Sequence, residues 1–169
     1  MRTFVTAPVA EGPWPGIVFY TDIFQLTEAS LRWAVRLAAR DAPVGASGHC
    51  TGGHLGFRAA FDARVDGTAL WYPTGLHNGK LGKDESDAFA RAGEIGRELL
   101  LIFGTRDPHT PPPGRATVKA ALDAAGTHYQ WHEYDAEHAF GRDIGPRFDP
   151  EATDRAFAET VAFFRRVLR

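Results

Sequence analysis

The sequence predicts an α/β fold in which residues 1–169 form a single domain with a mostly parallel sheet of about six strands and helices on both faces. Short apolar runs alternate along the chain with segments of helical periodicity, as they do in strand–helix–strand units. The clearest of these runs are apolar throughout, which is typical of parallel strands buried on both faces. The length of 169 residues suits one domain, and 44% of the residues are hydrophobic, as in an ordinary globular protein.

The N-terminal half is expected to hold four strands and two helices. Prolines and glycines at residues 11–16 predict a turn between the first two strands, because neither residue type continues a regular element. Thr27 can cap the first helix, and the second helix begins at Thr51. In chain order, we expect strands at residues 3–7, 17–20, 42–47 and 68–72, and helices at residues 27–40 and 51–61.

The C-terminal half begins with a polar stretch at residues 77–96, in which a short helix is expected near residues 85–92. The clearest buried strand of the chain follows at residues 98–103, and a strand near a sheet edge is expected at residues 129–134. Between them lies a helix that ends at Gly126, a good C-terminal cap. The last helix begins after Asp149 as its cap, with Pro150 in the first turn, and one face carries Phe157, Val161, Phe164 and Leu168.

Composition and charge exclude several classes of protein. Lys and Arg number 19 against 21 Asp and Glu, so the net charge of −2 gives no reason to expect a nucleic-acid partner. No apolar run approaches the roughly 18 residues that cross a bilayer, and the first residues are too poor in apolar side chains for a secretory signal. A single cysteine excludes an internal disulfide, so we expect a reducing compartment and a cytoplasmic location.

The motif Gly48-x-Cys50-x-Gly52-Gly53 lies between an expected strand and an expected helix. This is the setting of a nucleophile elbow, in which a strained turn lifts one side chain above the sheet and crowds its neighbours too closely for a Cβ. The N-terminus of the helix would favour a thiolate and offer a backbone N–H to an oxyanion. The alternative is that Cys50 is only a small buried residue in a glycine-rich turn.

Two further residues follow strands in the order that a hydrolase triad requires, which is nucleophile, acid, histidine. Asp107 comes just after the strand at residues 98–103, and His138 comes just after the strand at residues 129–134. Asp135 is a rival acid, although its closeness to His138 along the chain makes a productive approach difficult. His128 and His132 would lie about 13 Å apart on a strand, so a zinc site is not expected.

These motifs resemble the dienelactone hydrolase family of the α/β-hydrolase superfamily, over most of the chain. The resemblance implies a reduced α/β-hydrolase fold, with Cys50 as nucleophile, His138 as general base and Asp107 as the acid that orients it. It rests on residues 12–18, on Asp22-Ile23-Phe24, on the glycine-flanked cysteine, on residues 104–108 and on His138-Ala139-Phe140.

The same resemblance implies further site residues. The backbone N–H groups of Ile23 and Thr51 would form the oxyanion hole, and Asp22 takes the place of an acidic residue, usually Glu, that contacts the resting thiol. Arg142 matches an arginine that binds the substrate carboxylate, with a solvated loop arginine as the alternative. Trp71 and Tyr72 match positions where the family often has aromatic pocket residues, although both are equally compatible with a place in the core.

One strand–helix unit of the family is absent, because residues 40–43 pass directly from the first helix into the strand before the elbow. Right-handed crossovers then predict a sheet in sequential order, with the first strand antiparallel at the edge and the helix at residues 27–40 on the face opposite the last helix. Apolar sheet surface left exposed would favour a homodimer. The missing unit also removes a second carboxylate-binding arginine, for which Arg106, Arg115 and Lys80 are candidate replacements.

The sequence therefore predicts hydrolysis of small-molecule ester, lactone or thioester bonds, including anionic ones, through an acyl-thiol intermediate. No metal or organic cofactor is required. Two other hypotheses remain open: a catalytically degraded binding or scaffold protein of the same fold, and a thiol redox protein that uses Cys50 alone.

Overall fold

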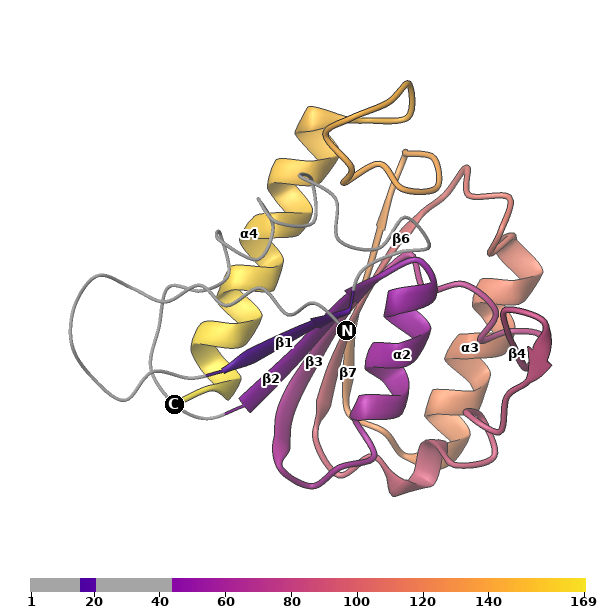
Figure 1. Ribbon diagram of the computed structural model, residues 1–169, viewed down its shortest axis with the longest axis vertical. Helices are drawn as coiled ribbons and strands as arrows, with labels where there is room; N and C mark the ends of the chain where they lie inside the picture. The colour runs from indigo at the N-terminus through magenta and orange to yellow at the C-terminus, as the bar shows by residue number, and fades with distance from the viewer. Residues whose placement is uncertain (1–15, 21–43) are drawn as a thin grey trace.

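The structure of the protein is a computed structural model that describes residues 16–20 and 44–169. Five parallel strands form one sheet in the order β1-β2-β3-β6-β7, and helices cover both of its faces (Figure 1). A separate short pair, β4-β5, lies in the connection between β3 and β6. The strands are β1 (Ile17–Tyr20), β2 (Val44–His49), β3 (Val65–Trp71), β4 (Lys80–Leu81), β5 (Asp84–Glu85), β6 (Glu98–Gly104) and β7 (Tyr129–Tyr134).

The order of the strands in the sheet is their order in the chain, which confirms the sequential topology and the α/β class. Two expectations fall on residues that the structure does not describe: the antiparallel edge strand at residues 3–7, and the helix at residues 27–40 with its placement on one face. The described strands end together at one edge of the sheet, so the loops after β2, β6 and β7 meet there.

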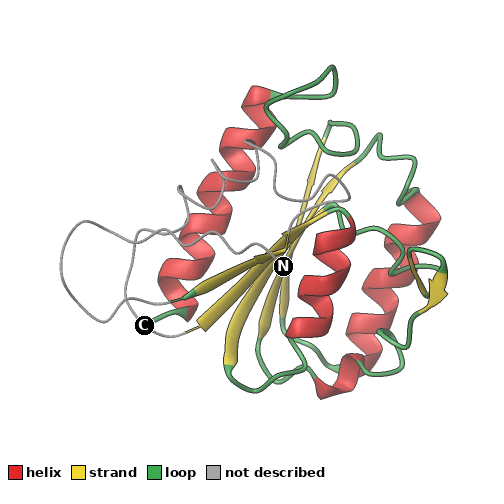
Figure 2. Cartoon of the chain, viewed as in Figure 1, coloured by secondary structure: helices red, strands yellow, loops and turns green. Residues whose placement is uncertain are grey.

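Helices α2 (Thr51–Ala59) and α3 (Pro112–Ala125) cover one face of the sheet (Figure 2). Strand β6 shows why this face is buried: Leu99, Leu101 and Phe103 point toward the two helices, while the residues between them point the other way. Gly126 ends α3 in the left-handed conformation with φ 67°, as expected of a cap glycine.

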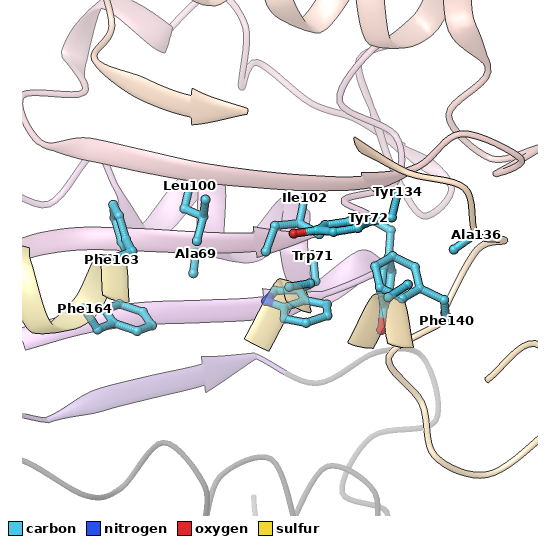
Figure 3. Close-up of a cluster of buried hydrophobic side chains, with 12 residues drawn as sticks. Ala69, Trp71, Tyr72, Leu100, Ile102, Tyr134, Ala136, Phe140, Phe163 and Phe164 are labelled. Carbon is cyan, nitrogen blue, oxygen red and sulfur yellow. The ribbon is translucent and has the colours of Figure 1, made fainter. Parts of the chain in front are cut away.

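Helix α4 (Pro150–Val167) packs on the other face, where Trp71, Ile102 and Phe163 belong to a cluster of buried side chains (Figure 3). The Asp149 side chain accepts a hydrogen bond from Ala152 N–H at 2.9 Å, which confirms the expected N-cap. The expected apolar stripe is rotated slightly: Phe164 is buried, but the other buried positions of the helix are Ala152, Thr153, Ala156, Thr160 and Phe163.

The expected helix near residues 85–92 is wrong. Gly79 and Gly82 adopt positive φ angles of 64° and 66°, and the chain turns back on itself between β4 and β5. The segment then reaches β6 through a single 3-10 turn, η1 (Ala92–Glu94). No helix within the described residues has the length and apolar character of a membrane span.

Candidate active site

Cys50 lies at the turn between β2 and α2 with a φ of 58°, a conformation that costs energy for a residue with a side chain. Neighbouring backbone leaves no space for further side chains here. A Cβ at Gly48 would stand 2.0 Å from Gly52 O, and a Cβ at Gly53 would stand 2.9 Å from Pro73 Cα. The glycines of the motif therefore allow a close turn that presents a half-buried thiol at the N-terminus of a helix.

The structure brings Cys50, His138 and Asp107 into one hydrogen-bonded chain, although 88 residues separate the first two. His138 Nε2 lies 3.2 Å from Cys50 Sγ, and His138 Nδ1 lies 2.7 Å from Asp107 Oδ2. His138 and Asp107 are 5% and 2% exposed, so the interaction between them is shielded from water, whereas the His138–Cys50 contact is part-buried. This is the geometry of a nucleophile, a base and an orienting acid.

The electrostatics of the pair favour charge separation. Burial alone would raise the pKa of the Cys50 thiol, but the hydrogen bond and charge of His138, with help from Thr51, lower the pKa overall. Burial acts to lower the pKa of His138, yet the hydrogen bonds and charges of Asp107 and Cys50 raise it to about 9. Both directions favour a thiolate beside an imidazolium at neutral pH, which is the reactive form of a cysteine nucleophile.

The loop that carries Asp107 is held at several points. His109 N–H donates to Asp107 Oδ1 at 2.7 Å, so both carboxylate oxygens have a partner. The buried Arg115 donates to the carbonyls of Thr110 at 2.9 Å and Gly104 at 3.4 Å, which links the two ends of the loop. Each of these contacts restricts the orientation of the acid and, through it, of His138.

His109 also contributes its side chain to the site. Its ring meets the ring of His138 edge to face, with 4.5 Å between the centroids. Burial and the charge of His138 lower the pKa of His109, so His109 is neutral beside a protonated His138. From the sequence, His109 is expected only as a surface or pocket-rim residue, although its position two residues after Asp107 is a usable signal for a closer role.

A cavity of about 510 Å³ opens at the thiol, within the size range of small-molecule sites. Its lining includes Cys50, Thr51, His138 and Arg142, and none of the described residues that line it is acidic. Arg147, which no sequence motif indicated, also lines the cavity, and its Nε lies 3.5 Å from Glu137 Oε2. The spacing of Arg147 five residues after Arg142 carries no recognisable periodicity in a loop.

Comparison with known proteins decides the family. The model of the dienelactone hydrolase family matches residues 27–168. The chain belongs to the dienelactone hydrolase family. A relative from Saccharomyces cerevisiae is 38% identical over 133 residues, which are 75% of this chain and 49% of the relative. The carboxymethylenebutenolidase of Pseudomonas sp. (strain P51) is 29% identical over 143 residues, 82% of this chain and 56% of that protein.

The chain thus spans about half the length of the curated relatives it matches. Solved structures are similar in fold over nearly all of it. A structure from Klebsiella pneumoniae has a TM-score of 0.83 at 19% identity and covers 94% of this chain and 90% of that chain. A dienelactone hydrolase-like promiscuous phosphotriesterase from metagenomic libraries has a TM-score of 0.75 at 18% identity, with 95% and 89% covered. The likeness confirms the α/β-hydrolase type of fold.

Two residues that the family resemblance selected, Asp22 and Ile23, lie outside the described residues. The structure places the two aromatic candidates in the core and not in the cavity wall. Trp71 is fully buried and donates from Nε1 to Thr160 Oγ1 at 3.1 Å. Tyr72 is 1% exposed, and its ring packs 5.2 Å from that of His138 (Figure 3 shows Tyr72 among the core side chains).

The charged candidates for other roles have partners elsewhere. Asp135, the rival acid, is exposed and pairs with Arg106 at 3.2 Å, while Asp107 contacts His138. Arg115 is buried in the Asp107 loop, and Lys80 pairs with Glu85 on β5. The candidate replacements for the missing carboxylate-binding arginine, Arg106, Arg115 and Lys80, are therefore not part of the cavity lining. Arg142 and Arg147 lie there instead.

Proposed function

We propose that the protein hydrolyses carboxylic ester, lactone or thioester bonds of small molecules through Cys50, His138 and Asp107. The observation that carries the proposal is the continuous Asp107–His138–Cys50 hydrogen-bond chain, of which Cys50 and His138 line a cavity. Membership of the dienelactone hydrolase family and the name of the Pseudomonas relative support the same bond type. The chemistry needs no metal or organic cofactor.

In the first half-reaction the thiolate of Cys50 attacks the carbonyl carbon of the substrate. The carbonyl oxygen gains the negative charge. The proposed oxyanion donors are the N–H of Thr51, at the N-terminus of α2, and the N–H of Ile23. The C–O bond of the ester then breaks, and His138 transfers its proton to the leaving oxygen. The products of this step are an alcohol and an acyl-thiol enzyme.

The second half-reaction follows from the electrostatics of the site. Acylation removes the negative charge on Cys50 Sγ, which is one of the causes of the raised pKa of His138. The pKa of His138 is therefore lower in the acyl-enzyme, so the ring that gave up its proton in the first half-reaction stays unprotonated and can take a proton from the attacking water. Asp107 holds Nδ1, so that Nε2 faces the water and the thioester. The acid is released and the thiolate is restored.

The substrate is proposed to be anionic. Arg142 and Arg147 both line the cavity, and no acidic residue of the described chain does. A carboxylate on the substrate would match this charge, with Arg142 as its proposed partner.

Two further proposals concern the location of the protein in the cell and its oligomeric state. A cysteine nucleophile with a lowered pKa is sensitive to oxidation, which suits the reducing cytoplasm. Val18 and Val44, on the neighbouring strands β1 and β2, are 49% and 38% exposed, and this apolar surface on one face of the sheet supports a homodimer. Sedimentation of a monomer at micromolar concentration would contradict the dimer.

The test is hydrolysis of small activated esters, such as 4-nitrophenyl acetate, by the native protein and by Cys50→Ala. We expect turnover to disappear in the variant while its unfolding curve in urea stays close to that of the native protein. Undiminished turnover would refute the assignment. A folded native protein that neither turns over nor acylates would favour a binding or scaffold role. Peroxide reduction that survives His138→Ala would favour the redox role.

A further inference from the structure

The loop between the turn after His138 and helix α4 carries two large apolar side chains at the surface. Ile144 is 50% exposed and Phe148 is 37% exposed. Only three other large hydrophobic residues of the described chain are comparably exposed, namely Val18, Val44 and Leu55, and they belong to β1, β2 and α2. Two such side chains within five residues of one loop mark a surface that gains by covering apolar area.

Both side chains line the cavity that contains the thiol. Ile144, Pro146 and Phe148 share this cavity of about 510 Å³ with Cys50 and His138. The apolar surface therefore faces the space in which a substrate would sit. A group attached to the reacting carbonyl can reach it without leaving the cavity.

The loop is held by backbone hydrogen bonds at both ends. Arg142 N–H donates to Ala139 O at 3.0 Å, and Asp149 N–H donates to Phe140 O at 3.1 Å. Within the loop, Phe148 N–H donates to Gly145 O at 3.4 Å across a glycine with φ 122°. An apolar wall held in this way binds without first having to be ordered, which favours affinity.

We propose that residues 144–148 form a subsite for a bulky apolar group, aromatic or branched aliphatic, of the substrate. This inference rests on the proposed function and names the substrate class more closely: a small ester or lactone that carries such a group beside its negative charge. Ile144 and Phe148 determine the preference through contact with that group. One methylene in an apolar pocket commonly changes selectivity by about tenfold or more, so the preference is measurable.

The test uses Cys50 alkylation, which requires the thiolate but no hydrolysis. The rate constants for iodoacetamide and for its N-phenyl derivative are measured on the native protein, with glutathione as the reference thiol. We expect the native protein to favour the phenyl reagent by about tenfold or more over the ratio found for glutathione. In Ile144→Ala/Phe148→Ala the ratio should fall close to that of glutathione, with the iodoacetamide rate little changed. Leu55→Ala, an equally exposed side chain outside the cavity lining, should keep the native ratio.

Two results would overturn the subsite: a native ratio equal to that of glutathione, or a native ratio that survives in the double variant. Hydrolysis of 4-nitrophenyl acetate, measured on the same samples, separates the two proposals. A phenyl preference without ester turnover leaves the subsite standing and removes the hydrolase function. Ester turnover without a phenyl preference removes the subsite and leaves the hydrolase function standing.

Discussion

Replacing Asp107 by Asn removes the negative charge beside His138 while leaving the size of the side chain unchanged. The Asn oxygen can still accept from His109 N–H, so the loop keeps that bond. The Asn amide then faces His138 Nδ1 as a donor, at the place where the carboxylate now lies 2.7 Å away. Nδ1 must accept, and the only proton of a neutral ring moves to Nε2, toward the thiol. Such a ring cannot take the proton of Cys50.

The magnitude follows from the pKa of His138, which rises from 6.5 to about 9 in the folded protein. At about 1.36 kcal/mol per pH unit, this favours the imidazolium by about 3 kcal/mol over a free histidine. Burial acts in the opposite direction, so Asp107 and Cys50 together supply more than this amount. Asp107→Asn should therefore lower the thiolate population at pH 7, by about tenfold for each 1.4 kcal/mol that the carboxylate contributes.

The assay is the rate of Cys50 alkylation by iodoacetamide between pH 5 and pH 10. In the native protein we expect the rate to remain high as the pH falls through 8, because the thiolate persists down to its lowered pKa. In Asp107→Asn the rate should decline as the pH falls below the ordinary thiol range of about 8–9. Asp135→Asn is the matched control, since Asp135 is an exposed acid of the neighbouring loop that pairs with Arg106. A native pH profile in Asp107→Asn, or an equal loss in Asp135→Asn, would refute the reasoning.

Three further predictions concern stability. Gly48→Ala should lower the free energy of unfolding in urea by at least about 3 kcal/mol, because the new Cβ would stand 2.0 Å from the backbone oxygen of Gly52. Gly96→Ala is the control, and it should be neutral or slightly stabilising because no atom lies within 4 Å of its Cβ. Burial lowers the pKa of His49 to about 3, so the native protein should lose about 2 kcal/mol of its free energy of unfolding between pH 7 and pH 5, as the unfolded histidine becomes protonated. In His49→Gln this part of the pH dependence should disappear. A free energy of unfolding that falls by the same amount in the variant would contradict the assignment. Arg115→Met should lower the free energy of unfolding by about 1–3 kcal/mol, because two carbonyls of the Asp107 loop lose their donor, and it should also slow alkylation of Cys50 at pH 7. A urea midpoint equal to that of the native protein would show that the loop does not need this support.

Much of the fold could be predicted from local patterns. Residues 99–103 are apolar throughout, as expected of a strand such as β6 that is buried on both faces, and the cap residues Asp149 and Gly126 act within a few residues of their own position. The failures are also local in origin. A helix was expected near residues 85–92, but the chain just before them forms the β4–β5 hairpin, with Gly79 ahead of β4 and Gly82 in the turn, both at positive φ.

By itself the sequence determined which residues follow the C-terminal ends of the strands. It therefore determined which reactive side chains could come together, namely Cys50, Asp107 and His138. This was possible because strand–helix alternation fixes where a parallel strand ends, and parallel strands end at the same edge. Only the tertiary structure decided what surrounds them. It placed Trp71 and Tyr72 in the core, and it brought His109, Arg147 and Phe148 to the cavity. Long side chains on loops take their contacts from the packing of distant segments, and no spacing along the chain encodes that packing.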